Sequence, residues 1–61
     1  MDEASKKRCE SWIQPDHGLY SLGAFIYWQP GTPTVSLDGE FTVEELEWVT
    51  AYIRRVKYGW T

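Results

Sequence analysis

The sequence predicts a small single α+β domain, in which an antiparallel β-hairpin is packed on one face by one C-terminal α-helix. Residues 41–60 carry start and stop signals for a helix around an apolar stripe. Residues 19–29 are rich in aromatic and branched side chains, and turn residues separate them from a shorter apolar run at 34–38. A chain of 61 residues has room for one such domain, which we place at residues 11–61.

Residues 1–10 are predicted to be a flexible N-terminal tail, because charged and other polar side chains dominate them. The next segment, Ser11 to Gln14, contains Trp12 and Ile13, which are too apolar to be left in a tail. We therefore expect this segment to pack on the domain, and it is a candidate third strand. Pro15 to Gly18 has the composition of a turn.

Leu19 to Gln29 is predicted as the first strand, whose alternate side chains point to opposite faces. Its even-numbered face is almost wholly apolar and is expected to face the core: Tyr20, Leu22, Ala24, Ile26 and Trp28. Phe25 and Tyr27 would then lie on the other face, where large aromatic side chains need a cover. Residues 11–14, a second subunit or a partner protein could each provide that cover.

Pro30 and Gly31 suit the two central positions of a type II turn after this strand. Thr34 to Asp38 is predicted as the returning strand, with Val35 and Leu37 facing the core. The connecting loop is longer than the tight two-residue kind, so the sequence leaves the register of the hairpin open.

The C-terminal helix is predicted from Thr42 to Tyr58. Thr42 and Glu45 have the spacing of a capping box, and Gly59 can adopt the left-handed conformation that ends a helix. Apolar residues recur every three or four positions and should form one stripe toward the sheet: Leu46, Val49, Ile53 and Val56, with Trp60 continuing it.

The composition excludes several classes of site. Cys9 is the only cysteine and His17 the only histidine, so neither an intrachain disulfide nor a zinc site is expected. A net charge of −3 argues against a dedicated nucleic-acid binder, which would present a basic face. No apolar run is long enough for a signal peptide or a membrane span, and with the solitary thiol this predicts a soluble, cytoplasmic protein.

Catalysis is not expected, because the sequence has no phosphate-binding loop and no suitably spaced Ser/His/Asp or Cys/His set. We expect no metal, cofactor or small-molecule substrate either. Five carboxylates fall within ten residues, without the ligand spacing of a calcium loop: Asp38, Glu40, Glu44, Glu45 and Glu47. They leave one alternative open, an acidic mimic of nucleic-acid phosphates that blocks a DNA- or RNA-binding protein.

A second alternative is the binding of single-stranded nucleic acid through the sheet aromatics Phe25 and Tyr27. That mode requires basic residues nearby, and residues 19–41 contain no Lys or Arg. We therefore rank it below the others.

The predicted packing of the helix on the sheet does not account for the position of Trp48. At 100° per residue it lies about 160° around the helix from Leu46, on the polar side, and Tyr52 lies between it and the stripe. A tryptophan in this position either anchors a partner or is covered by the N-terminal residues. The predicted function is non-enzymatic protein binding, as a homodimer or on a larger protein. The predicted partner-binding residues are Trp48, Tyr52, Phe25, Tyr27, Glu44, Glu47 and Arg55.

The run from Val35 to Leu46 resembles the strand-to-helix junction of short uncharacterised accessory proteins of phages and prophages. The residues that carry the resemblance are Val35, Leu37, Asp38, Gly39, Phe41, Thr42, Glu44, Glu45 and Leu46. It implies a small accessory or inhibitor protein directed at a host protein in the host cytoplasm. The resemblance implies no ligand-binding residue and no active-site residue.

Overall fold

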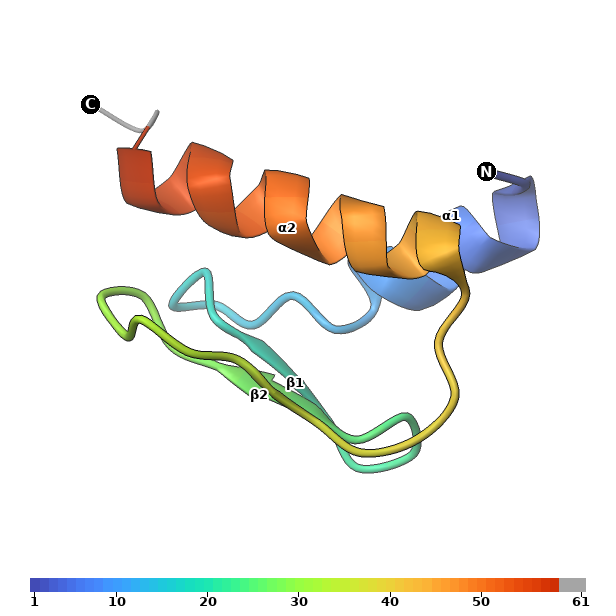
Figure 1. Cartoon of the computed structure of the whole chain (residues 1–61), viewed down its shortest axis with the longest axis horizontal. Helices are drawn as coiled ribbons and strands as arrows, with labels where there is room; N and C mark the ends of the chain where they lie inside the picture. The colour runs from blue at the N-terminus through green and yellow to red at the C-terminus, as the bar shows by residue number, and fades with distance from the viewer. Residues whose placement is uncertain (59–61) are drawn as a thin grey trace.

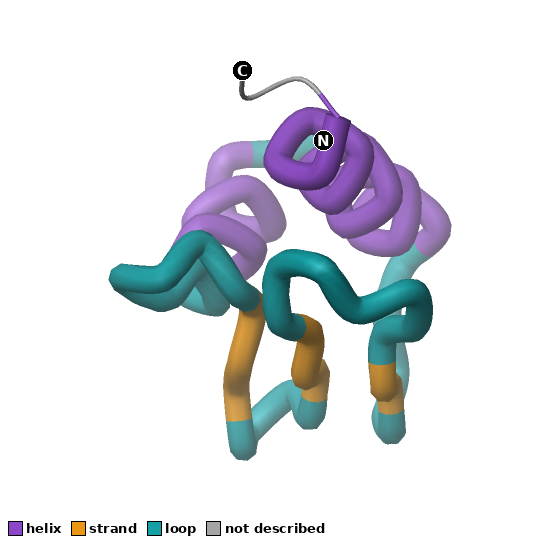
Figure 2. The backbone as a smooth tube through the Cα atoms, turned by 90° about the vertical axis from the view of Figure 1, so that its left-hand side faces the viewer, coloured by secondary structure: helices purple, strands orange, loops and turns teal. Residues whose placement is uncertain are grey.

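Five elements follow one another along residues 1–58, the part of the chain that the computed structural model describes. They are α1 (Glu3–Glu10), β1 (Leu19–Ser21), β2 (Ile26–Trp28), β3 (Ser36–Leu37) and α2 (Val43–Tyr58). The three strands form one antiparallel sheet, and both helices lie on the same side of it (Figures 1 and 2). The predicted α+β class is therefore confirmed. The helix end expected at Gly59 and the stripe position at Trp60 lie outside the described residues.

The sheet differs from the expected hairpin, because the long strand predicted from Leu19 to Gln29 is two strands. The chain reverses over residues 22–25, and β1 pairs with β2 with Tyr20 opposite Tyr27. Two local features hold this turn. The backbone N–H of Ala24 donates to Ser21 Oγ at 3.3 Å, and Phe25 adopts a left-handed φ of 47°.

The reversal changes which side chains face the helices. Leu19 in β1 and Ile26 and Trp28 in β2 are buried, whereas Tyr20 and Leu22, predicted to lie in the core, are exposed. A continuous strand would keep even-numbered residues on one face, but a turn resets the alternation.

The third strand is not formed by the expected residues. Ser11 to Gln14 contributes only an isolated bridge between Ile13 and Leu19, and β3 completes the sheet beside β2. β3 covers two residues of the predicted returning strand, and its Leu37 is exposed. The turn before it is confirmed, since the Thr32 N–H donates to the Gln29 carbonyl and Gly31 has a φ of 92°.

Residues 1–10, expected to be a flexible tail, contain the helix α1. The carboxylate of Asp2 caps this helix by accepting a hydrogen bond from the Ser5 N–H at 2.8 Å. Its last turn packs against α2, and Cys9 is fully buried, which raises the pKa of its thiol. The domain therefore includes this segment.

The start of α2 confirms the predicted capping box. The Glu45 N–H donates to Thr42 Oγ1 at 3.0 Å, and the Thr42 N–H donates back to Glu45 Oε1 at 2.9 Å. The buried side of α2 is rotated from the predicted stripe. Val49 lies in the core as expected, but Glu45 and Tyr52 are buried with it and Leu46 is largely exposed. The rotation follows from α1, which covers a side of α2 that was expected to face solvent (Figure 2).

The core lies between the sheet and the two helices, and Trp12 is at the centre of its aromatic part. The Trp12 ring meets Phe41 edge-on with centroids 5.6 Å apart, and meets Trp48 edge-on at 6.2 Å. Trp48 in turn stacks on Tyr52 at 5.2 Å. The segment at residues 11–14 thus supplies a main core residue rather than a strand. Neither helix in the described part of the chain has the length and apolar character needed to cross a membrane.

Candidate functional site

The side of the sheet turned away from both helices carries two tyrosines. Tyr20 and Tyr27 pair across β1 and β2, and their neighbours Leu19, Ile26 and Trp28 are buried under the helices. Successive side chains of a strand alternate between faces, so both tyrosines project from the uncovered side. They are 41% and 42% exposed, and their rings meet edge-on with centroids 6.2 Å apart. We call this pair the tyrosine face.

An open groove of about 340 Å³ lies beside the tyrosine face, lined in part by both rings, by residues 14–16 and by Gln29. The loop forming one wall is held by its own hydrogen bonds. The Gln14 amide donates to the Trp12 and Tyr20 carbonyls at 3.1 and 3.3 Å. The groove is therefore formed by the folded backbone before any ligand arrives.

Two further contacts fix this loop to the core. The Tyr52 hydroxyl donates to the His17 carbonyl at 2.8 Å, which joins α2 to the loop. Gly18 lies directly against β2, where an added Cβ would stand 2.7 Å from the Trp28 carbonyl oxygen. Such an approach is too close for any side chain, so the position requires glycine.

Among the described residues, no Lys or Arg lines the groove beside the tyrosine face. Residues 9–53 include neither Lys nor Arg, and Asp16 is the charged residue that lines the groove. The groove therefore offers aromatic rings, amides and one carboxylate. This chemistry suits apolar and hydrogen-bonding groups better than phosphates.

The predicted partner-binding residues fall into separate groups. Phe25 and Tyr27 are both exposed, Tyr27 on the tyrosine face and Phe25 in the turn at residues 22–25. The even-numbered pattern of residues 19–29 predicts Tyr20 in the core, but Tyr20 is exposed and completes the tyrosine face. Gly23, in the middle of the predicted strand, is the sequence signal that could have revealed the turn.

Trp48, Tyr52 and Arg55 come together around a shallow hollow of about 220 Å³ on α2. Tyr52 is nevertheless buried, and its phenol pKa is raised by that burial. Trp48 is half-buried against the core, with the Trp12 ring at its edge. Both aromatic side chains therefore pack against the core. Of the two possibilities for Trp48, the structure agrees with the one in which N-terminal residues cover it. The hollow exposes too little of either ring to make it the stronger candidate.

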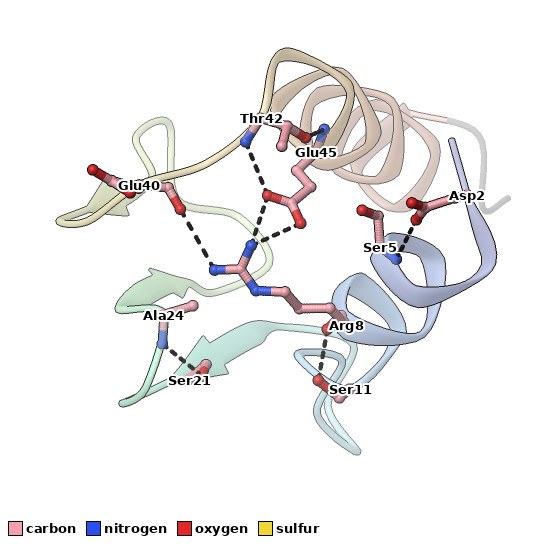
Figure 3. A network of polar contacts seen from close by, with 9 residues as sticks. All are labelled: Asp2, Ser5, Arg8, Ser11, Ser21, Ala24, Glu40, Thr42 and Glu45. Carbon is pink, nitrogen blue, oxygen red and sulfur yellow. Dashed lines mark hydrogen bonds and ion pairs between the residues drawn. The ribbon is translucent and has the colours of Figure 1, made fainter.

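The acidic cluster is divided between surface and interior. Glu47 is exposed on α2, and Glu44 forms an ion pair with the N-terminal ammonium of Met1 at 3.4 Å. Glu45 is 2% exposed and accepts two hydrogen bonds of 2.7 Å from the Arg8 guanidinium, one on each carboxylate oxygen (Figure 3). Nothing in the local sequence indicates this last pair, because its residues are 37 positions apart.

The environment of Glu45 favours the ionised carboxylate. The backbone N–H of Thr42 lowers the pKa of Glu45 most, and the hydrogen bond and charge of Arg8 lower it further, against the opposing effect of burial. The Arg8 guanidinium also lies over the rings of Trp12 and Phe41, 5.3 and 5.5 Å from their centroids. Arg8 and Glu45 therefore link α1 to α2.

The chain matches no protein-family model, no curated protein and no solved structure. Among residues 1–58, no three His, Cys, Asp or Glu side chains are grouped in a way that could hold a metal ion. A function can therefore be inferred only from the exposed surfaces of this domain.

Proposed function

We propose that the protein is a non-enzymatic protein-binding module that occupies a surface of a larger protein through the tyrosine face. The observation that supports this most is the pair of half-exposed rings, Tyr20 and Tyr27, on a sheet face that neither helix covers. Tyrosine is enriched at the centres of protein interfaces, because its ring buries a large area and its hydroxyl finds a hydrogen-bond partner. The adjoining groove, with its fixed wall, can receive a side chain of the partner.

The charges favour a protein partner over nucleic acid. A strand of DNA or RNA stacked on Tyr20 and Tyr27 would need cations for its phosphates, and residues 9–53 supply none. Mimicry of phosphates is weakened too, since Glu45 is buried with Arg8 and Glu44 pairs with the N-terminus. The resemblance of residues 35–46 to phage and prophage proteins favours an accessory protein whose partner belongs to a host.

Replacement of Tyr27 with alanine is expected to weaken partner binding by at least about tenfold, because truncating a central interface tyrosine removes a large buried contact. A photo-crosslinking amino acid at position 20 would first capture the partner in host cells. Calorimetry would then measure its affinity for the purified wild type and Tyr27→Ala.

Lys6→Ala is the matched control, since it truncates an exposed side chain of α1 and should leave the affinity unchanged. Equal affinity of wild type and Tyr27→Ala, with both folded by circular dichroism, would contradict the proposal. Quenching of tyrosine fluorescence by single-stranded oligonucleotides at low salt would favour the nucleic-acid alternative instead.

A further inference from the structure

One side of α2 carries exposed residues that neither α1 nor the strands contact, although Thr50 and Arg54 at its edge also border residues 32–35. An open groove of about 370 Å³ runs along it, lined by Val43, Leu46, Glu47, Thr50, Ala51 and Arg54. Its two largest apolar side chains, Val43 and Leu46, are 70% and 38% exposed. The buried residues Glu45, Val49 and Tyr52 point the other way. We call these six lining residues the outer α2 face.

The charges on the outer α2 face are arranged symmetrically about its middle. Glu47 and Arg54 are seven residues apart, which is about two helical turns, so they lie on the same side of α2. Each is about 5 Å along the axis from a midpoint between Thr50 and Ala51. Neither Glu47 nor Arg54 forms an ion pair with another side chain that the structure describes.

From this order we infer that the outer α2 face binds a second copy of the same chain, with the two α2 helices antiparallel about a two-fold axis at Thr50 and Ala51. The axis would bring Glu47 of each copy opposite Arg54 of the other, which forms two equivalent ion pairs. A parallel pair in register would instead place like charges together. Glu47 and Arg54 can therefore pair with the same residues of a second copy only when the two helices are antiparallel.

The side chains at the proposed crossing have the sizes that a close helix pair needs. Thr50 and Ala51 are small, so the two axes can approach to about 8–10 Å. Leu46 lies about one turn before the crossing in each copy and would lose exposed apolar surface on pairing. One helix pair buries less than a standard interface of about 1,600 Å², so the dimer should form weakly and in fast exchange.

This surface is distinct from the tyrosine face. The residues that line the groove on α2 do not line the groove beside Tyr20 and Tyr27, which project from the side of the sheet that the helices leave uncovered. Pairing through α2 therefore leaves the tyrosine face open, and a dimer would present two copies of it.

Sedimentation equilibrium of the purified chain tests the inference over about 10 μM to 1 mM. We expect the mean mass to rise above the 7.1 kDa of the monomer as concentration increases, and to fall when salt is added. Glu47→Arg and Arg54→Glu should each raise the dimer dissociation constant at least about tenfold, because each places like charges opposite one another. An equimolar mixture of these two variants should form a heterodimer, since its cross-copy pairs are again of opposite sign.

Lys6→Glu is the matched control, because it reverses an exposed charge on α1 and should leave the dissociation constant unchanged. A wild type that stays monomeric to 1 mM, or a mixture of the two reversed variants that stays monomeric, would overturn the inference. Loss of the dimer in Tyr27→Ala with retention in Glu47→Arg would also overturn it and would assign self-association to the tyrosine face.

Discussion

Truncation of Trp12 to alanine is expected to lower the free energy of unfolding by about 3–5 kcal/mol. Trp12 is almost fully buried and its ring contacts Phe41 and Trp48, so its removal leaves a cavity between α2 and the strand-to-helix connection. A domain of this size has a total stability of about 3–9 kcal/mol. The variant should therefore be largely unfolded or close to it, as measured by urea denaturation followed by circular dichroism.

Ile13→Ala is the neighbouring control for this prediction. Ile13 is partly exposed, so its truncation should cost about 1 kcal/mol or less. If Trp12→Ala leaves no folded protein to measure, Trp12→Phe gives an intermediate loss that can be compared with Ile13→Ala. Similar losses in Trp12→Phe and Ile13→Ala would show that Trp12 is not at the centre of the core.

Replacement of Arg8 with methionine is expected to lower the free energy of unfolding by about 3 kcal/mol, because it leaves the Glu45 carboxylate buried without its cation. This is the lower end of the usual range for a broken buried pair, since the Arg8 side chain is 40% exposed and water can replace part of the contact. Lys7→Met, a charge removal on the exposed side of the same helix, should cost much less. Equal losses from the two substitutions, measured by urea denaturation, would contradict the role assigned to the pair.

The pair also predicts a direction of pH dependence. The pKa of Glu45 is lower in the folded state than in the unfolded state, so its stabilisation is complete above the unfolded value. As pH falls from about 5 through the folded pKa, the unfolded chain binds the proton first and stability decreases. Glu45→Gln should therefore show a smaller loss of stability than wild type between pH 6 and pH 3. The Asp2 carboxyl, whose pKa is lowered by the Ser5 backbone N–H, contributes in the same direction in both proteins.

Local signals in the sequence predict where the helices and strands begin better than they predict which elements contact each other. The start of α2 follows from Thr42 and Glu45, which satisfy each other within one turn of helix. The same Glu45 also receives Arg8, and no periodicity in the sequence indicates a partner so distant in the chain. This contact explains why α1 belongs to the domain and why the buried side of α2 is rotated from the apolar stripe.

The candidate site was predictable in part. Tyr27 was expected on the uncovered side of the sheet, and it lies there. The pattern of residues 19–29 does not predict Tyr20 at this face, because it is that of one continuous strand, whereas the chain turns around Gly23. Trp48 could not be assigned from its position on the helix alone, because its cover comes from Trp12, 36 residues earlier in the sequence.

The ion pair between Arg8 and Glu45 also bears on the order in which the chain can acquire its structure. Synthesis begins at the N-terminus, so α1 emerges long before the carboxylate that holds it, which follows 37 residues later. The first half of a nascent chain has neither this anchor nor the α2 side of the core. The chain therefore loses most of its conformational entropy in a single late step. In that step α2 packs on the hairpin and on α1 together, and the contacts that it forms offset the loss. A chain cut before residue 45 is expected to remain unfolded and to be removed by proteases rather than to persist as a stable fragment.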